Sequence, residues 1–185
     1  MMSIKEKYKK EVIPKMKEKF GYKNDFAVPK IEKAVVNVGI GKVLNSIDPS
    51  KKKELKKGIF SDISLICGQS PVLTRAIKAI AGFKVRQGST VGVKATLRRS
   101  KMNDFLDRLI NVVLPRMRDF QGVPKTSIDD GGNLTVGIKE HIVFPEIQPE
   151  KVKKNFSLQV TVVTNAKKKE EAIELFKLLG FPIKK

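Results

Sequence analysis

The stretch Val91-Gly92-Val93-Lys94-Ala95-Thr96-Leu97-Arg98 alternates apolar and polar side chains, as is typical of a strand in a half-buried sheet. Its apolar residues share one face, whereas Lys94, Thr96 and Arg98 lie on the other. Antiparallel sheets commonly pack helices against one face and leave the other in contact with water. The stretch therefore predicts a sheet with one covered, apolar face and one open, polar face.

The same alternation recurs elsewhere and gives the other strands. Asn37 faces away from its apolar neighbours Val36 and Val38, which places it on the open face beside Lys94 and Thr96. The predicted strands cover residues 34–40, 72–75, 91–98, 134–139 and 156–163.

Amphipathic helices are predicted between these strands, and their ends carry clear signals. The first covers Ser3–Phe20, and the second begins at Pro49, with Asp48 as its cap, and ends at Gly68. A third covers residues 102–113 and is expected to end or kink at Pro115, and a last one covers residues 172–179. The pattern predicts a single α+β domain over residues 1–185, with helices on one face of an antiparallel or mixed sheet.

Residues 121–133 show no periodic pattern. The segment is rich in turn-forming residues, among them Gly122, Pro124 and Asp129-Asp130-Gly131-Gly132. We expect it to run over the surface.

The charge balance favours a polyanionic partner. The chain has 38 Lys and Arg against 19 Asp and Glu, a formal net charge of +19. No acidic residue occurs between Asp62 and Asp104, although eight cations lie there: Arg75, Lys78, Lys84, Arg86, Lys94, Arg98, Arg99 and Lys101. Unpaired cations over a sheet and a loop repel one another unless an anion lies against them. RNA fits better than duplex DNA, because no basic recognition helix or zinc-finger spacing is present.

Catalytic and metal-binding chemistry lacks the necessary residues. His141 is the only histidine and Cys67 the only cysteine, which excludes a histidine cluster and a Cys/His zinc site, and we expect no histidine-dependent triad. Asn37-Val38-Gly39-Ile40-Gly41 resembles a nucleotide-binding loop, but Leu44 occupies the third glycine position. We expect no enzyme, cofactor, metal or small-molecule substrate, and a soluble protein that has no contact with membranes.

Four stretches together resemble a known family. They are residues 28–39, 68–76, 80–88 and 133–147, and they include Gln69 and the loop sequence Gly82-Phe83-Lys84. In order and spacing they are similar to the bacterial ribosomal protein L5 family. The resemblance implies a protein of the large ribosomal subunit, in the cytoplasm, that binds 5S ribosomal RNA in the central protuberance through its open sheet face.

The resemblance also implies particular contacts. Asn37, Gln69 and Thr96 match polar positions that contact 5S RNA in the family. Together with the charge pattern, this gives an expected 5S-binding set of Asn37, Gln69, Thr74, Arg75, Lys94, Thr96 and Arg98. The loop around Ala81–Gln87 is expected to reach peptidyl-site tRNA, through Ala81, Gly82, Phe83, Lys84 and Arg86. Further expected partners are 23S ribosomal RNA, the small-subunit protein S13 and neighbouring large-subunit proteins such as L18.

Two other hypotheses remain open on the residues alone. One is a nucleic-acid-processing enzyme whose site has no recognisable motif, and the other is a basic protein of membrane surfaces or chromatin. The first lacks a catalytic constellation. The second would need a basic helix with a free apolar face, whereas these helices need their apolar faces to cover the sheet.

Overall fold

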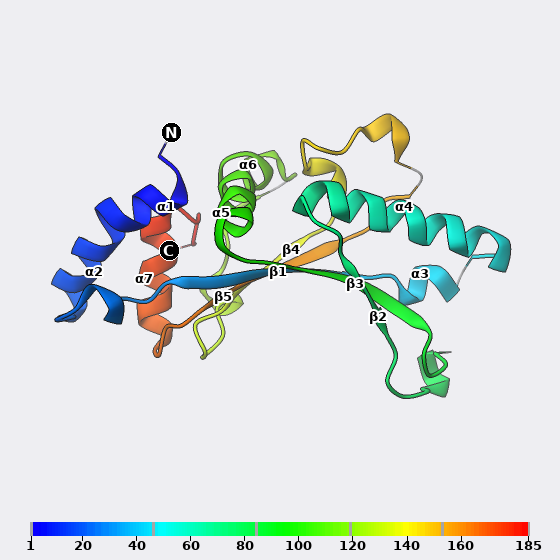
Figure 1. The fold of residues 1–185 in the computed structure, drawn as a ribbon, viewed down its shortest axis with the longest axis horizontal. Coiled ribbons are helices and arrows are strands. Elements are labelled where there is room, and N and C mark those ends of the chain that lie inside the picture. The colour runs from blue at the N-terminus through cyan, green and yellow to red at the C-terminus, as the bar shows by residue number, and fades with distance from the viewer. Residues whose placement is uncertain (1, 46, 84, 119, 153, 185) are drawn as a thin grey trace. The chain divides into compact units, whose positions relative to one another are not determined.

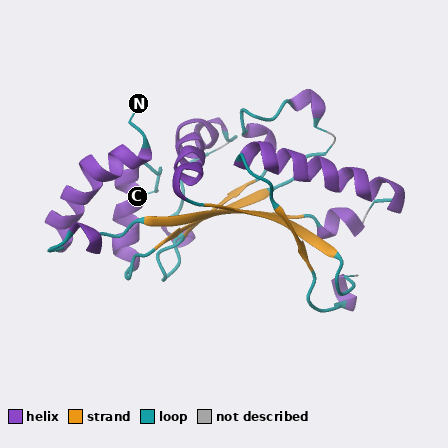
Figure 2. Cartoon of the chain, in the orientation of Figure 1, coloured by secondary structure: helices purple, strands orange, loops and turns teal. Residues whose placement is uncertain are grey.

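A five-stranded sheet organises the chain (Figures 1 and 2). The computed structural model describes residues 2–45, 47–83, 85–118, 120–152 and 154–184. The strand order is β2-β3-β1-β5-β4, with β1 Ile31–Gly39, β2 Val72–Arg75, β3 Thr90–Leu97, β4 Leu134–Ile138 and β5 Leu158–Thr164. The sheet is antiparallel and the class is α+β, so the predicted fold class is confirmed.

The chain forms two compact units. The first comprises Met1–Ala34, Leu97–Val136 and Thr161–Lys185, and the second comprises Val35–Thr96 and Gly137–Val160. Four of the five strands contribute residues to both units. The expectation of one domain over residues 1–185 stays a prediction.

The second unit holds the helix that covers the apolar face of its strands. In β3, Val93 and Ala95 are buried, as are Val36 and Val38 of β1. The covering helix is α4, Pro49–Cys67, and it follows the short α3, Gly41–Asn45. Its buried residues are Ile59, Ile63, Ile66 and Cys67.

The ends of α4 agree only partly with prediction. Gly68 ends the helix in a left-handed conformation, with φ of 62°, as its glycine predicts. Asp48 stands at the N-cap position, as predicted, but its side chain makes no capping hydrogen bond to the helix. Instead the backbone oxygen of Asp48 accepts from the N–H groups of Lys51 and Lys52. Pro49 at the first helical position suffices to start the helix because its φ is already helical.

In the first unit, both long predicted helices contain a wide π turn just before a proline. The first runs as α1 (Ile4–Lys7), the π turn η1 (Tyr8–Val12) and α2 (Ile13–Phe20). The third runs as α5 (Arg99–Arg108), the π turn η4 (Leu109–Val113) and α6 (Leu114–Arg116). Pro14 and Pro115 are each the second residue of the helix that follows. A proline ring clashes with the carbonyl one turn earlier, and a wider turn makes room for it.

The segment 121–133 is a surface excursion only in part, because residues 124–126 and 129–131 are exposed but two apolar side chains are buried. Val123 and Ile128 expose only 3% and 1% of their surface. The N–H of Val123 donates to the Pro182 carbonyl at 2.7 Å, and the N–H of Lys184 donates to the Val123 carbonyl at 2.9 Å. The residues that follow α7 (Lys169–Leu179) therefore hold this segment against the core of the first unit.

The remaining elements are short 3-10 turns. They are η2 Asp25–Ala27, η3 Ala81–Phe83, η5 Lys125–Ser127, η6 His141–Val143 and η7 Pro149–Lys151. Among the described residues, no helix is both long and apolar enough to cross a membrane.

Candidate nucleic-acid interface

The open face of the second unit brings several predicted residues together. Asn37 and Lys94 are exposed, and Thr74 and Thr96 are half-buried. In the antiparallel pairing of β2 with β3, Val72 lies opposite Lys94 and Thr74 lies opposite Gly92. Directly paired residues point to the same face, so Thr74 joins Lys94 and Thr96 there. The face offers amide, hydroxyl and ammonium groups.

Gly92 allows a close approach at the centre of this face. A Cβ on Gly92 would lie 2.7 Å from the Thr74 Oγ1 and 2.8 Å from the Val38 carbonyl oxygen. The Thr74 hydroxyl therefore occupies the space that a side chain at position 92 would fill. Gly92 was not among the predicted site residues, although a glycine inside a strand is a signal of close approach.

Gln69 has a structural contact that the sequence did not reveal. It follows Gly68 and is half-buried, and its side-chain Nε2 donates a hydrogen bond to the Thr96 carbonyl at 2.9 Å. The contact joins the end of α4 to β3. The amide nitrogen of Gln69 is thus engaged within the protein.

Arg75 and Arg98 lie at the ends of strands. Arg75 is exposed at the end of β2, where a register shift occurs between Thr74 and Arg75. Arg98 is exposed and belongs to the first unit, where it precedes α5. Its neighbour Arg99 has φ of 54°, a left-handed conformation that residues other than glycine rarely adopt, and the chain turns there from β3 into α5.

The β2–β3 loop is a hydrogen-bonded hairpin. Ile80 and Val85 exchange two backbone hydrogen bonds, of 3.0 and 3.2 Å, which close η3. Ala81, Gly82 and Arg86 are exposed, and Phe83 exposes 67% of its surface. Lys84 lies outside the described residues.

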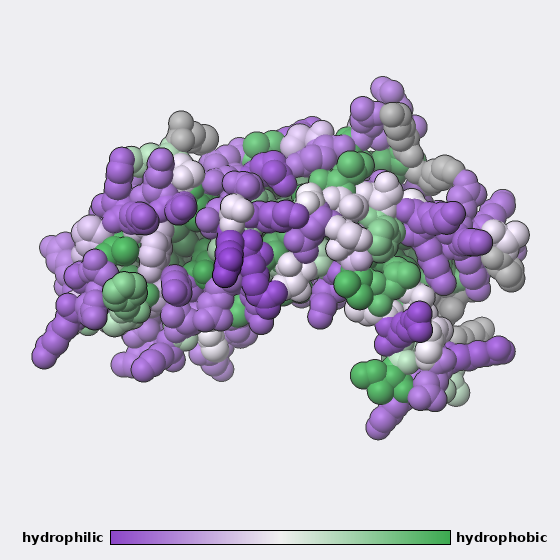
Figure 3. Space-filling view, viewed as in Figure 1, coloured by the Kyte–Doolittle hydropathy of each residue, from purple (hydrophilic) through white to green (hydrophobic). Residues whose placement is uncertain are grey.

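Apolar side chains of this loop border a hollow that was not predicted. It measures about 540 Å³ and is lined by Gly41, Ala76, Ile77, Lys78, Ile80, Phe83, Val85 and Val91. Ile77 is 84% exposed. Figure 3 shows hydrophobic residues on this loop among hydrophilic ones. The sequence could have indicated this hollow, because Ile77 and Ile80 are large apolar residues in a loop that otherwise contains cations.

His141 is fully buried in the second unit. Its ring stacks on Phe156, with 3.8 Å between centroids, and its Nδ1 accepts a long 3.5 Å bond from the Phe156 N–H. Nε2 has no hydrogen-bond partner among the described residues and lies 3.7 Å from an Asp62 carboxylate oxygen. Burial lowers the pKa of His141 although Asp62 opposes the shift, and burial raises the pKa of Asp62.

This pair predicts a loss of stability in mild acid. Because its pKa in the folded state is below the ordinary 6.5, His141 binds a proton more readily once the chain unfolds. Stability should fall as the pH drops below 6.5 and level off below the folded-state pKa. Asp62 acts in the opposite direction at lower pH, because its raised pKa favours proton uptake in the folded state.

Thermal unfolding of the native chain and of His141→Gln at pH 7.5 and 5.5 measures this effect. The native chain should lose more stability than the variant over that interval. Since the chain has one histidine, an equal loss in both proteins would show that His141 is not responsible.

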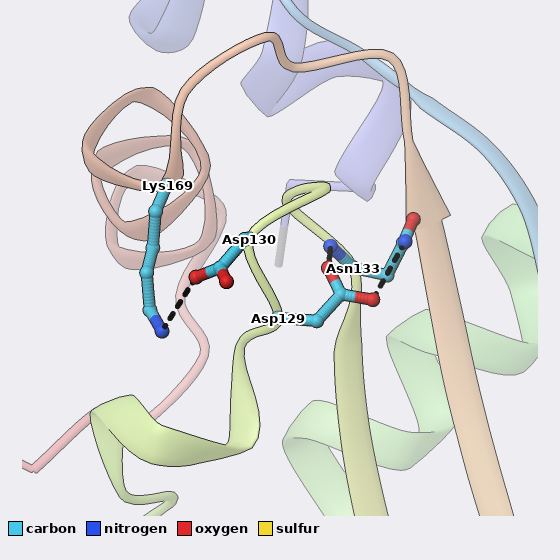
Figure 4. Close-up of polar contacts among 4 residues, drawn as sticks. All are labelled: Asp129, Asp130, Asn133 and Lys169. Carbon is cyan, nitrogen blue, oxygen red and sulfur yellow. Dashed lines mark hydrogen bonds and ion pairs between the residues drawn. The ribbon is translucent and has the colours of Figure 1, made fainter.

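The adjacent carboxylates Asp129 and Asp130 make structural contacts, Asp129 within its own turn and Asp130 with α7 (Figure 4). Asp129 accepts from the backbone N–H and the side-chain Nδ2 of Asn133, at 2.7 and 2.9 Å. Asp130 lies 3.6 Å from the Lys169 Nζ. These hydrogen bonds lower the pKa of Asp129, which keeps it ionised. The two groups have separate partners and form no catalytic dyad.

No group of three or more side chains suited to hold a metal ion occurs in the part of the chain that the structure describes. The chemistry that the described residues do assemble is the cationic and hydrogen-bonding surface of the second unit.

Two family models match successive parts of the chain. The model described as ribosomal protein L5 matches residues 24–86, and the model described as the C-terminus of the ribosomal L5 family matches residues 90–183. The first match includes β2 and α4, and the second begins with β3. The open face thus draws its strands from both matched parts.

Curated proteins are similar over the full length. The large ribosomal subunit protein uL5 of Halothermothrix orenii is 50% identical over 182 residues, which are 98% of each chain. That of Syntrophomonas wolfei subsp. wolfei is 50% identical over 184 residues, covering 100% of both. That of Clostridium acetobutylicum is 48% identical over 179 residues, which are 97% of this chain and 96% of the relative.

Proposed function

Since this chain belongs to the ribosomal protein L5 family, we propose that it binds 5S ribosomal RNA on the open sheet face and contacts peptidyl-site tRNA with the β2–β3 loop. Its membership makes it a structural protein of the large ribosomal subunit, in the cytoplasm, and not an enzyme. The expected family, location and absence of catalysis are therefore confirmed, and the enzyme, membrane and chromatin hypotheses are set aside.

The observation that carries the 5S proposal is the composition of the open face. Lys94, Asn37, Thr74 and Thr96 present a cation and neutral polar groups on neighbouring strands. Residues 63–103 contain cations but no carboxylate. Phosphate oxygens would neutralise them, and ribose hydroxyls and base edges would pair with the neutral groups.

Each side chain suits a different part of an RNA. Lys94 and Arg75 are exposed cations that neutralise phosphates. The Asn37 side chain carries two N–H hydrogen-bond donors and one carbonyl acceptor, which allow it to form paired hydrogen bonds with a base edge. Gln69 uses one N–H of its amide on Thr96, which leaves the amide oxygen to accept from, and the second N–H to donate to, a ribose or base.

The loop suits contacts of another kind. Phe83 and Ile77 are largely exposed on a basic hairpin. The face of an aromatic ring such as that of Phe83 can stack on any nucleotide base, whatever its sequence. This arrangement supports the tRNA contact. Contacts with 23S RNA and with proteins such as S13 and L18 belong to the same proposal, because large-subunit proteins lie among RNA and protein neighbours.

Asn37→Ala is expected to reduce discrimination rather than general RNA affinity. Loss of one good base-edge contact costs about 1–3 kcal/mol, so the preference for 5S RNA over tRNA should fall roughly fivefold to a hundredfold. Competition binding with the two RNAs measures this ratio. Asn155→Ala removes an exposed asparagine outside the sheet and serves as control. An unchanged ratio in Asn37→Ala would remove Asn37 from the recognition surface.

The proposed function as a whole is tested by capturing the tagged full chain from a lysate and sequencing the bound RNA. Enrichment of 5S RNA over tRNA and messenger RNA is the expected result. Recovery of other RNA without 5S RNA would overturn the proposal.

A further inference from the structure

We infer that the outer edge of β2, together with the hollow at the base of the β2–β3 loop, binds an extended segment of a partner protein that is rich in acidic and apolar residues. The segment adds a strand beside β2 and places an apolar side chain in the hollow. This interaction surface goes beyond the proposed function, because it does not depend on which RNA the chain binds.

β2 is an edge strand with exposed apolar side chains. It is the first strand in the order β2-β3-β1-β5-β4, and within the described residues only β3 pairs with it. Val72 exposes 66% and Leu73 39% of their surface, on opposite faces because successive side chains of a strand alternate. At the other edge of the sheet, the apolar residues of β4 expose 5% or less, namely Leu134, Val136 and Ile138. An exposed apolar edge such as that of β2 is a surface on which another strand can pair.

The hollow begins where β2 ends. Its lining includes Ala76, Ile77 and Lys78, which directly follow the last residue of β2. Backbone hydrogen bonds fix this place, because the Ala76 N–H donates to the Ser89 carbonyl and the Gly88 N–H donates to the Ala76 carbonyl, both at 2.9 Å. A segment that pairs with β2 therefore meets the hollow at one end.

The edge and the hollow supply the two parts of strand addition. Main-chain hydrogen bonds along the edge give affinity, and side-chain pockets give specificity. The hollow, of about 540 Å³, has the size of a ligand site. Ile77 and Ile80 on its lining expose 84% and 49% of their surface, so an apolar side chain placed there would remove aliphatic surface from water.

Charge determines the chemistry of the partner segment. Arg75, Lys78 and Arg86 are exposed cations, at the end of β2, on the lining of the hollow and in the loop. Residues 63–103 contain no carboxylate. Acidic side chains of a partner would complement these cations, while its apolar side chains lie against β2 and in the hollow. The partner segment should therefore carry acidic and apolar residues close together.

A protein segment suits this surface better than RNA or a second copy of the chain. RNA has no peptide groups with which to continue the hydrogen-bond ladder of a sheet, and phosphates need cations and not aliphatic side chains. A second copy would bring another net charge of +19 against the first. An acidic segment of another protein meets neither obstacle.

Selection from a library of random peptides of about ten residues, displayed on phage, identifies sequences that the immobilised native chain binds. The selected sequences are expected to combine acidic with apolar residues. The sequence that binds most tightly is then made as a fluorescent peptide, and its affinity for the native chain and for two variants is measured by fluorescence anisotropy.

The two variants each remove one exposed apolar side chain. Ile77→Ser does so at the hollow, and Phe26→Ser is the matched control, because Phe26 is 91% exposed and belongs to the first unit. Far-UV circular dichroism and urea unfolding show that both variants are folded. Ile77→Ser should weaken peptide binding about tenfold or more, as loss of an apolar anchor does, whereas Phe26→Ser should change it by less than about twofold.

Hydrogen exchange locates the bound peptide. Backbone amides that gain a hydrogen-bond partner exchange more slowly, so saturating peptide should slow exchange in Val72–Arg75 of the native chain. Slower exchange confined to residues outside 72–80 would place the peptide elsewhere and overturn the inference.

Other results would also overturn it. The selection could yield no binding sequence, or sequences without acidic or without apolar residues. An equal loss of affinity in Ile77→Ser and Phe26→Ser would mean that the peptide adheres to any exposed apolar side chain. Dimers of the native chain in sedimentation, with exchange in Val72–Arg75 that slows as the protein concentration rises, would identify a second copy as the occupant. Failure of the proposed function would appear separately, as a native chain without preference for 5S RNA.

Discussion

Gly92→Ala is expected to destabilise the protein by about 1–3 kcal/mol, as overpacked sites typically do. The added methyl would lie 2.8 Å from the Val38 carbonyl oxygen and 2.7 Å from the Thr74 hydroxyl. The Thr74 side chain can rotate away, but the Val38 carbonyl is backbone in β1 and can move only if the pairing of β1 with β3 is disturbed. Urea unfolding at neutral pH measures the difference in free energy.

Gly39→Ala is the matched control. Gly39 ends β1, and a Cβ there would have no atom within 4 Å. The substitution should be neutral or stabilise by a few tenths of a kcal/mol, because alanine loses less backbone entropy on folding. Equal destabilisation by both substitutions would mean that strand propensity, and not the contact over Gly92, decides the outcome.

Removing the cations beside the open face should weaken 5S RNA binding and its dependence on salt. In Arg75→Ala/Lys94→Ala two exposed charges of the second unit are lost. With about 0.9 in slope for each phosphate contact, the salt slope should fall by roughly two and the affinity at moderate salt by about tenfold or more. Filter binding over a series of salt concentrations measures both quantities.

Lys10→Ala/Lys15→Ala removes the same charge from exposed positions of the first unit. It should leave the slope with 5S RNA almost unchanged. If the two double variants lowered the slope equally, the binding would depend on net charge, and Arg75 and Lys94 would hold no particular phosphates.

Much of the fold could be predicted because it depends on local patterns. Alternation placed Asn37, Lys94 and Thr96 on one face, and β2 has the predicted bounds, Val72–Arg75. Gly68 and Gly180 end helices in left-handed conformations, as expected of glycine at these positions. In each case the relevant interaction lies within a few residues along the chain.

Contacts between distant segments were missed. The burial of Val123 depends on residues after α7, about sixty positions away, and the burial of His141 depends on Phe156 and on Asp62 of α4. No local pattern carries this information. The prolines were recognised as breaks, but the π turns that accommodate Pro14 and Pro115 follow from three-dimensional crowding.

Periodicity, composition and matching stretches were enough to establish the α+β class, the sheet with one open face, the excess of positive charge and the family. All of these can be read along the chain. Three-dimensional packing was needed to show that Thr74 lies over Gly92, that Gln69 donates to Thr96, and on which side of β1 and β3 the helix α4 lies. Strand register and helix packing set these relations, and both arise only when segments far apart in sequence bury their apolar faces together.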